Sequence, residues 1–404
     1  MYIELFKTLA IYKNIFEKDI NGREINIYKL KDSIASGHSL FYPNILLKSE
    51  NQLILPLLER TMSLKCNTIY EKTNMEYNYI SVKNYKKYYD PIFFFIYNTD
   101  NYFHFLYDSL PYLISYLELK KEINNLKLLM QYPNQSKITF YKFVNEMLEL
   151  LNINKNDIIL VEPNTMYSEI YISTSYTHDI DSNLPPRQEI YDLYKTLVNN
   201  VKMNYSLKET PKKIYVSRRT WIHNDYSNIG TNYTCRRKFC NEDEFVEKLL
   251  NEDYVEVFTE KLSTIEKILY FSNATHVIGA IGGGISNVLF SNSNLYLEAI
   301  ISPTFLDVNS RFKYSLEKVN VNYNYNTKHI ETNEFKTYMR VITNDKRIVG
   351  EIEKITNNKL LVSYTDGSNT GWNSENIYKK IELYKKDVNK LDNGLNSPWE
   401  LIIN

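Results

Sequence analysis

The chain has 404 residues, and its 48 acidic and 48 basic side chains give a formal net charge of zero, which provides no general attraction to nucleic acid. Hydrophobic residues make up 43% and aromatic residues 14% of the sequence, which excludes a disordered chain and is sufficient for two or three domains. We expect a cytoplasmic protein, because no apolar run reaches the roughly 20 residues of a membrane helix, no signal peptide is recognisable, and the three cysteines have no metal-binding spacing.

Alternating strands and helices are predicted through most of the chain, although residues 1–90 show no clear pattern. In the first half, the predicted strands are residues 92–97, 126–130, 158–161 and 170–173, and the predicted helices are residues 101–110, 138–151 and 185–203. Residues 208–212, which include a proline, are the best candidate for a linker between domains.

One face of the predicted helix at residues 101–110 is polar and carries Asn101, His104 and Asp108. A carboxylate beside an imidazole supplies a general base that can remove a proton from a hydroxyl group. His104 and Asp108 are therefore candidate catalytic residues. The alternative is a structural role, in which Asn101 caps the helix and His104 is bonded locally.

The second half of the chain continues the alternation. The predicted strands are residues 213–219, 254–258, 276–281 and 295–301, and helix caps are predicted at Asn241 with Glu244 and at Ser263 with Glu266. This order is typical of a doubly wound α/β domain, and the whole chain predicts two such domains. Ligands of such domains bind beyond the carboxyl ends of the parallel strands.

From about residue 340 the pattern changes to short strands joined by Asn-Asn and Asp-Gly turns, which indicates a small β-rich extension. Two interpretations are open: a small barrel-like fold, or a hairpin cap on the second α/β domain.

Three successive glycines, Gly282, Gly283 and Gly284, separate a predicted strand from a short predicted helix. Residues without a Cβ atom allow a sharp turn and let a ligand touch the backbone. Backbone N–H groups and the positive end of a helix then meet at one point, which suits a phosphate group. The alternative is a tight turn that only lets the helix pack against the strand.

Basic residues are predicted near the same edge of the sheet. Arg218 and Arg219 end a predicted strand, and Arg236 and Arg237 precede the next helix. Guanidinium groups match diphosphate oxygens in a bidentate manner, although these residues could also be ordinary surface arginines. Glu298 is predicted at the end of a later strand, where a carboxylate could accept hydrogen bonds from a ribose diol or could be a paired structural acid.

Five short motifs occur in the order that characterises glycosyltransferase family 61: residues 101–108, 213–219, 237–242, 279–287 and 297–298. The chain resembles this family over about residues 90–305. The resemblance implies a GT-B fold of two Rossmann-like domains that face a cleft, with an N-terminal acceptor-side domain at residues 1–207 and a nucleotide-sugar-binding domain at residues 208–338. The β-rich C-terminal extension, residues 339–404, lies outside the resemblance.

The resemblance also implies roles for individual residues. It assigns catalysis to His104 and Asp108, and it assigns binding of the substrate or donor to Asn101, Ser217, Arg218, Arg219, Arg237, Gly282, Gly283, Gly284, Asn287 and Glu298. This sequence departs from the family pattern at the glycine turn, where many members have histidine at the position of Ile281 and alanine at the position of Gly283. We expect the preference for the donor, or the affinity for it, to differ accordingly.

The expected reaction is an inverting transfer of a sugar from a nucleotide-diphosphate sugar, expected to be UDP-linked, to a hydroxyl of a glycan or glycoprotein. No metal or other cofactor is expected, since GT-B enzymes generally need no metal, although Asp179 and Asp181 form an Asp-x-Asp sequence that resembles a metal site. We expect no nucleic-acid partner and no membrane span, and the C-terminal extension is a candidate surface for a partner or a homo-oligomer.

Two alternative functions are a nucleotide-sugar epimerase, which can share the two-domain architecture, and a non-catalytic module that binds glycans or proteins. A Rossmann oxidoreductase is disfavoured because residues 282–287 lack the third glycine of the dinucleotide motif.

Overall fold

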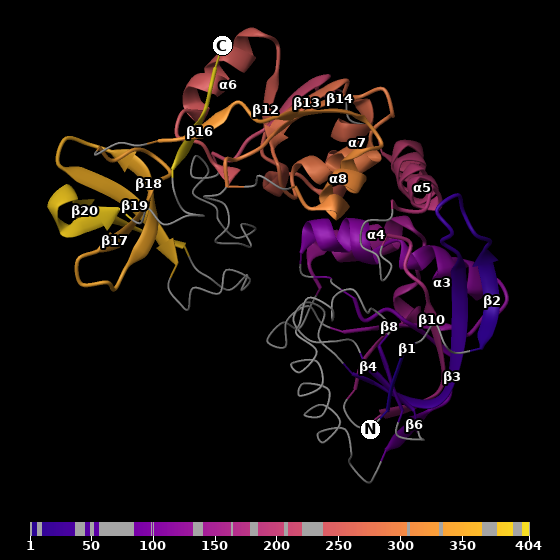
Figure 1. Cartoon of the computed structure of the whole chain (residues 1–404). Helices are drawn as coiled ribbons and strands as arrows, with labels where there is room; N and C mark the ends of the chain where they lie inside the picture. The colour runs from indigo at the N-terminus through magenta and orange to yellow at the C-terminus, as the bar shows by residue number, and fades with distance from the viewer. Residues whose placement is uncertain are drawn as a thin grey trace. The chain divides into compact units, whose positions relative to one another are not determined.

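A computed structural model describes the chain except for residues 1, 6–9, 37–44, 49–51, 56–84, 98, 100, 132–139, 163–164, 178–184, 206–208, 220–236, 305–307, 331–333, 366–377, 391–397 and 404 (Figure 1). The chain divides into two structural units. The first contains Met1–Met203 and Ser310–Ser315, and the second contains Asn204–Asn309 and Leu316–Asn404. The β-rich segment that was predicted as a third domain, residues 339–404, is thus grouped with the second unit.

The described residues of the first unit form a ten-stranded sheet in the order β1-β5-β4-β3-β10-β7-β8-β9, with β2 also paired to β3 and β6 also paired to β10. The strands are β1 (Tyr2–Leu5), β2 (Ile11–Phe16), β3 (Ile25–Ser36), β4 (Ile45–Lys48), β5 (Gln52–Leu55), β6 (Lys86–Tyr88), β7 (Ile92–Phe94), β8 (Lys127–Met130), β9 (Ile158–Leu160) and β10 (Thr165–Ser173).

This sheet is mixed. The strands β10, β7, β8 and β9 run parallel, as predicted, but β10 pairs antiparallel with the long strand β3. The prediction of a doubly wound domain in the first half of the chain is therefore wrong for the N-terminal strands. The pairing of β3 with β10 joins residues that are far apart in sequence, so no local pattern could indicate it.

The helices of the first unit are η2, a π-helix (His104–Ser109), α3 (Tyr112–Lys120), α4 (Lys142–Leu150), the 3₁₀ helix η3 (Lys155–Asp157) and α5 (Glu189–Asn204). Pro111 lies between η2 and α3 and is the N-cap of α3, so the predicted interruption of the helix occurs there. The apolar side of η2 is buried at Phe105, Leu106 and Tyr107, and this burial leaves His104 on the partly exposed side.

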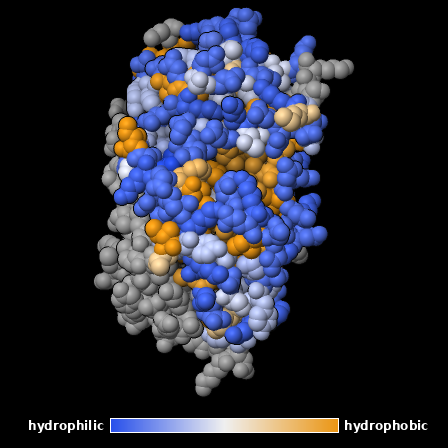
Figure 2. Space-filling view, turned by 90° about the vertical axis from the view of Figure 1, so that its right-hand side faces the viewer, coloured by the Kyte–Doolittle hydropathy of each residue, from blue (hydrophilic) through white to orange (hydrophobic). Residues whose placement is uncertain are grey.

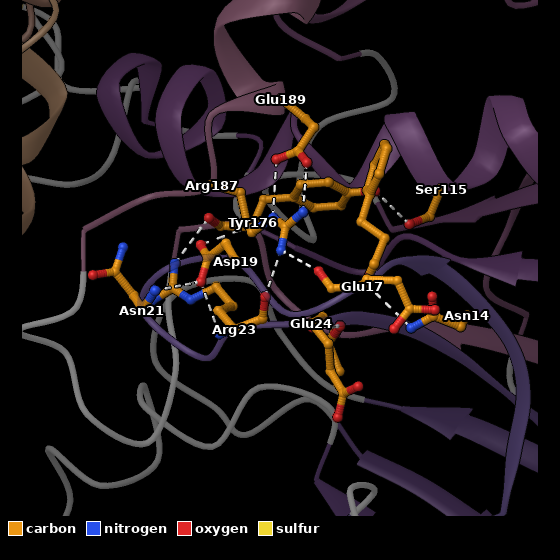
Figure 3. A network of polar contacts seen from close by, with 12 residues as sticks. Asn14, Glu17, Asp19, Asn21, Arg23, Glu24, Ser115, Tyr176, Arg187 and Glu189 are labelled. Atoms are coloured by element: carbon orange, nitrogen blue, oxygen red, sulfur yellow. Dashed lines mark hydrogen bonds and ion pairs between the residues drawn. The ribbon is translucent and has the colours of Figure 1, made fainter.

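A network of polar contacts fixes the turn between β2 and β3 against the start of α5 (Figure 3). The guanidinium group of Arg187 donates from Nη1 to the backbone oxygen of Glu17 at 2.7 Å and from Nε to Glu189 Oε2 at 2.9 Å. Arg23 Nη1 donates to the backbone oxygen of Tyr176 at 2.9 Å, and the hydroxyl of Tyr176 lies 2.9 Å from Ser115 Oγ on α3. These bonds connect the N-terminal strands to the helices that surround η2.

The second unit contains a five-stranded sheet in which all described strands are parallel, in the order β12-β11-β13-β14-β15. The strands are β11 (Lys213–Val216), β12 (Val255–Val257), β13 (His276–Ala280), β14 (Tyr296–Ile300) and β15 (Asn320–Asn324). The connecting helices are α6 (Glu242–Asn251), η6 (Thr259–Lys261), α7 (Thr264–Asn273), η7 (Ile285–Phe290) and α8 (Ser310–Leu316), of which α8 belongs to the first unit except for Leu316. This is one of the common doubly wound orders, and the chain changes direction between β11 and β13.

The predicted helix caps of the second unit have different outcomes. Ser263 and Glu266 form the predicted capping box on α7, with Ser263 N–H donating to Glu266 Oε2 at 2.7 Å and Glu266 N–H donating to Ser263 Oγ at 3.2 Å. Asn241 is the N-cap residue of α6, as predicted, but its side chain makes no cap hydrogen bond and instead bonds to both backbone groups of Leu401, at 2.8 and 3.0 Å. A distant strand therefore takes the amide group that a local pattern assigned to the helix.

The C-terminal extension is β-rich, as predicted. Its described strands β17 (Arg340–Thr343), β18 (Val349–Ile355), β19 (Lys359–Thr365), β20 (Tyr378–Tyr384) and β21 (Val388–Lys390) form an antiparallel sheet in the order β20-β19-β18-β17-β21, with the 3₁₀ helix η8 (Lys385–Asp387) before β21. A separate pair is formed by β16 (Thr327–His329) and β22 (Trp399–Leu401). In this sheet the last strand, β21, pairs with the first, β17, and the described strands form no closed barrel.

The strand β22 is part of the core of the parallel domain. Trp399 and Leu401 are 1% and 3% exposed and pack with Tyr215, Phe239 and Phe245. The extension is therefore integrated with the α/β domain through its last described strand.

The surface is largely polar in the view of Figure 2, where hydrophobic residues gather in separate patches among hydrophilic ones. Within the described residues, no helix is both long enough and apolar enough to cross a lipid bilayer.

Candidate active-site residues

The carboxyl ends of β11 and β13 are neighbours in the sheet of the second unit, because the two strands pair in parallel. Residues 217–219 follow β11, and residues 281–284 follow β13. The change of chain direction also lies between these strands, and this is the position where doubly wound domains bind ligands. The fold thus brings two of the predicted motifs to one place.

Gly282 lies directly against the predicted arginines. A Cβ atom on Gly282 would be 2.3 Å from Arg218 Nη2 and 3.1 Å from Arg237 Nη1, so the absence of a side chain makes room for both guanidinium groups. The other two glycines have different surroundings. A Cβ atom on Gly284 would be 2.7 Å from Val216 Cγ1, whereas a Cβ atom on Gly283 would have no neighbour within 4 Å.

Arg218 is a desolvated cation. Its Nε and Nη2 atoms are buried and have no hydrogen-bond partner among the described residues. Burial lowers the pKa of the Arg218 guanidinium, although the carboxylates of Glu260 and Glu242 oppose this effect. Buried charged donors without acceptors cost free energy, and an anionic ligand would satisfy them.

Glu242 fixes the strand end that carries Arg218, and this role was not predicted from the sequence. Its side chain is fully buried, and Oε1 accepts hydrogen bonds at 2.8 Å from the hydroxyl of Tyr215 and at 2.8 Å from the backbone N–H of Arg218. Burial raises the pKa of Glu242 to about 7, although these hydrogen bonds act in the opposite direction. The signal in the sequence that could have identified Glu242 is its place in the motif at residues 237–242, one of the five family motifs.

Arg219 differs from Arg218, because its guanidinium group is held by two acids. It lies 2.6 Å from Glu256 Oε2 on β12 and 2.8 Å from Asp243 Oδ1 on α6. Burial alone would lower the pKa of Arg219, but the hydrogen bonds with Glu256 and Asp243 raise it above its ordinary value. These contacts point to a structural role.

Three further predicted binding residues are bonded within the turn or the sheet. Ser217 Oγ accepts from the backbone N–H of Arg219 at 3.1 Å, and Asn287 Nδ2 donates to the Gly284 carbonyl at 2.8 Å. Glu298 is in the middle of β14 rather than at its end, and its Oε1 accepts from Asn324 Nδ2 at 2.6 Å. The helix that follows the glycines is a 3₁₀ helix of only six residues, so its dipole contributes little to anion binding.

In the first unit, the predicted pair on the polar face of η2 is formed. His104 Nδ1 lies 2.6 Å from Asp108 Oδ2, and the two side chains are 28% and 3% exposed. The backbone N–H of His104 donates to Asn101 Oδ1 at 3.2 Å, so Asn101 supports the start of this helix. The π-helical form of η2 is rare in proteins and is frequently found at functional sites.

A third residue, Arg311 on α8, joins this pair and was missed in the sequence. Its Nη2 atom lies 2.5 Å from Asp108 Oδ2 and 3.1 Å from His104 Nδ1. Arg311 lies 203 positions after Asp108, and no periodic pattern connects the two.

Comparison with known families identifies the region that contains most of these residues. The family model Glycosyltransferase 61 matches residues 102–297. This segment is a glycosyltransferase family 61 domain. A comparison with curated protein sequences gave no significant match.

The family 61 domain includes His104, Asp108, Arg218, Arg237 and the three glycines, whereas Asn101, Glu298 and Arg311 lie just outside its matched residues. A glycosyltransferase has a donor and an acceptor substrate, and the family 61 domain contributes residues to both units. The predicted catalytic pair and most of the predicted binding residues therefore belong to one family domain, but the pair lies in the first structural unit and these binding residues lie in the second.

Three residues considered in the sequence lie outside the described part of the structure: Asp179, Asp181 and Arg236. Within the described residues, no cluster of three or more His, Cys, Asp or Glu side chains could hold a metal ion. Because the Asp-x-Asp sequence is not among them, the expectation that this glycosyltransferase needs no metal stays a prediction.

Proposed function

We propose that this glycosyltransferase is an inverting enzyme that transfers a sugar from a nucleoside-diphosphate sugar to a hydroxyl of a glycan or glycoprotein acceptor. The observation that carries the proposal is Arg218, whose desolvated guanidinium group lies against Gly282 at the carboxyl edge of the parallel sheet. Arg237 reaches the same glycine. Two guanidinium groups suit a diphosphate leaving group, since its negative charge grows as the glycosidic bond breaks.

The proposed acceptor side consists of His104 and Asp108. If Nδ1–H of His104 donates to Asp108 Oδ2, the second ring nitrogen, Nε2, is the acceptor of the proton from the acceptor hydroxyl. Asp108 is almost fully buried, whereas part of the imidazole is exposed. These exposures favour His104 as the general base and Asp108 as the residue that orients it.

In the proposed reaction, the acceptor oxygen forms a bond to the anomeric carbon while the bond from that carbon to the diphosphate breaks. The hydroxyl proton moves to His104 Nε2, and the electron pair of the broken bond leaves on the diphosphate beside Arg218 and Arg237. A single displacement of this kind inverts the configuration at the anomeric carbon. No step requires a metal ion.

The proposal is tested first by ligand binding. We expect UDP to raise the melting temperature of the wild-type protein, because a ligand at 100 times its Kd stabilises the native state by about 2.7 kcal/mol. Arg218→Ala should weaken UDP binding by about 10- to 100-fold in isothermal titration calorimetry, which is the usual cost of losing a hydrogen bond between charged groups. Arg219→Ala is the matched control, since its guanidinium group is bound by Glu256 and Asp243.

The donor part of the proposal fails if UDP and other nucleoside diphosphates neither bind nor stabilise the wild-type protein. Incubation of a UDP-sugar without acceptor separates the epimerase alternative, because only an epimerase would release the isomeric nucleotide sugar.

A further inference from the structure

We propose that Arg311 is a positioning residue that holds the Asp108–His104 pair in the geometry required for proton removal. This inference rests on the proposed function, because it gives His104 the role of general base. Arg311 lies beyond residue 297, where the family match ends. The contacts of α8 carry the inference.

The first observation is that both donors converge on one oxygen. Asp108 Oδ2 lies 2.5 Å from Arg311 Nη2 and 2.6 Å from His104 Nδ1. Arginine carries only donors, so Arg311 Nη2, 3.1 Å from His104 Nδ1, could donate only to an unprotonated Nδ1. The shorter contact of Nδ1 is the 2.6 Å one with the carboxylate of Asp108, which Arg311 keeps ionised, and a carboxylate only accepts. This contact favours the tautomer with the proton on Nδ1 and with Nε2 as the basic nitrogen.

The second observation concerns the burial of the ion pair. The side chains of Arg311 and Asp108 are 18% and 3% exposed. A buried carboxylate with a charged, well-oriented donor has little freedom to rotate, and ion pairs of this kind specify orientation more than they add stability. Removal of the guanidinium group would let the carboxylate and then the imidazole turn away from the productive geometry.

The third observation is the path of the chain. The helix α8 connects β14 to β15, which are strands of the second unit, but Ser310–Ser315 belong to the first unit. The next residue, Phe312, stacks on Phe103 with ring centroids 4.6 Å apart, and the Phe103 ring lies 5.3 Å from the imidazole of His104. Adjacent residues of α8 thus contact Asp108 directly and the ring beside His104.

The test compares Arg311→Ala, Arg311→Lys and a matched control, Lys313→Ala, which changes an exposed cation of the same helix. We expect Arg311→Ala to lower kcat for sugar transfer by about 10- to 100-fold, with the Kd for UDP unchanged within about two-fold. Arg311→Lys should recover part of the activity, and about 20 mM guanidinium chloride should partly restore Arg311→Ala, because the free ion can occupy the vacated space. Lys313→Ala should behave as wild type.

A second measurement does not depend on transfer activity. In protein labelled with ¹⁵N-histidine, with the His104 signals assigned by their absence in His104→Gln, the wild type should show the Nδ1–H tautomer of His104. Arg311→Ala should show a mixture of both tautomers. If the wild-type protein transfers no sugar, the proposed function fails, and this spectrum still tests the positioning role.

The inference is overturned if Arg311→Ala keeps wild-type kcat and an unchanged His104 spectrum. It is also overturned if activity is lost but neither lysine nor guanidinium restores any of it and the tautomer is unchanged. In that case Arg311 would only stabilise the fold and would not position His104.

Discussion

Gly282 and Gly283 are neighbours in sequence but differ in the space beside them. A methyl group on Gly282 would meet the end of the Arg218 side chain at 2.3 Å, whereas a methyl group on Gly283 would meet nothing within 4 Å. Gly282 also has φ of +159°, a backbone conformation that residues with a side chain rarely adopt. The added methyl group should therefore displace the guanidinium group and also strain the backbone.

We accordingly predict that Gly282→Ala weakens UDP binding by about ten-fold or more, which corresponds to about 1.4 kcal/mol, and that it also lowers the melting temperature without ligand. Gly283→Ala is the matched control and should change neither quantity. Calorimetric titration and thermal unfolding measure the two effects. Equal UDP affinity in the two variants would show that Arg218 does not contact the diphosphate.

A second residue-scale prediction concerns the pH dependence of stability. The pKa of Glu242 is about 7 in the folded protein, against an ordinary value of 4.5, because its carboxyl group is buried. Between these two values the unfolded chain has lost the proton while the folded protein keeps it, so the folded state loses stability as the pH rises. The full contribution of the Glu242 carboxyl group to the free energy of unfolding is present below about pH 4.5, and about 3 kcal/mol of it is lost by about pH 7.

Glu242→Gln keeps the shape of the side chain but does not titrate. We expect the difference in the free energy of unfolding between the wild type and Glu242→Gln to fall from pH 4.5 to pH 7 and to stay constant above that range. Urea denaturation at a series of pH values measures this difference, in which the titration of all other groups cancels. A difference that does not vary with pH would contradict the raised pKa.

At the scale of the elements, the packing of β22 makes the C-terminal extension necessary for the stability of the parallel domain. Trp399 is 1% exposed and lies in the core of the parallel domain. Replacing a buried tryptophan with alanine typically costs about 3–5 kcal/mol. We therefore predict that Trp399→Ala lowers the free energy of unfolding by this amount in urea denaturation.

Ile402→Ala is the control for this prediction, since Ile402 is 45% exposed and lies three positions away. Its effect should be within about 0.5 kcal/mol of zero. If the two substitutions cost the same, β22 is not part of the core.

Most elements with a clear local pattern could be predicted from the sequence. The parallel strands of the second unit and the capping box of α7 follow from apolar periodicity and from residues that are close together in the chain. The antiparallel pairing of β3 with β10, and the bonds of Asn241 to Leu401, depend on partners more than 100 positions away. No window of sequence contains both partners, so these features required the structure.

The same distinction applies to the candidate site. His104 and Asp108 are four positions apart on one helix, and their contact was predictable from helix geometry. The approach of Arg218 to Gly282 followed from the doubly wound pattern, because both residues come directly after neighbouring parallel strands. Arg311 was not predictable, since α8 leaves the unit of its flanking strands and nothing in its own sequence indicates where it packs.

At the scale of the whole molecule, the two sets of candidate residues belong to different structural units: His104 and Asp108 to the first, and Arg218 and Gly282 to the second. In the proposed mechanism, Asp108 orients the base that acts on the acceptor, whereas Arg218 binds the donor. We predict that Asp108→Asn abolishes measurable sugar transfer while the Kd for UDP stays within about two-fold of the wild-type value.

The corresponding control is Arg218→Ala, which should lose UDP affinity while the His104 tautomer in the ¹⁵N spectrum is unchanged. Undiminished transfer by Asp108→Asn would remove Asp108 from the proposed mechanism. A large loss of UDP affinity in that variant would show that the two sets are energetically coupled.

The position of β22 has a consequence for biosynthesis. Asn241 bonds to Leu401, which is translated 160 residues later. At about 5–20 residues per second, a ribosome needs on the order of 10–30 seconds to cover that distance. Throughout this interval the apolar side of the nascent α/β domain that Trp399 later covers stays open to water, so a molecular chaperone has a defined period in which to bind it.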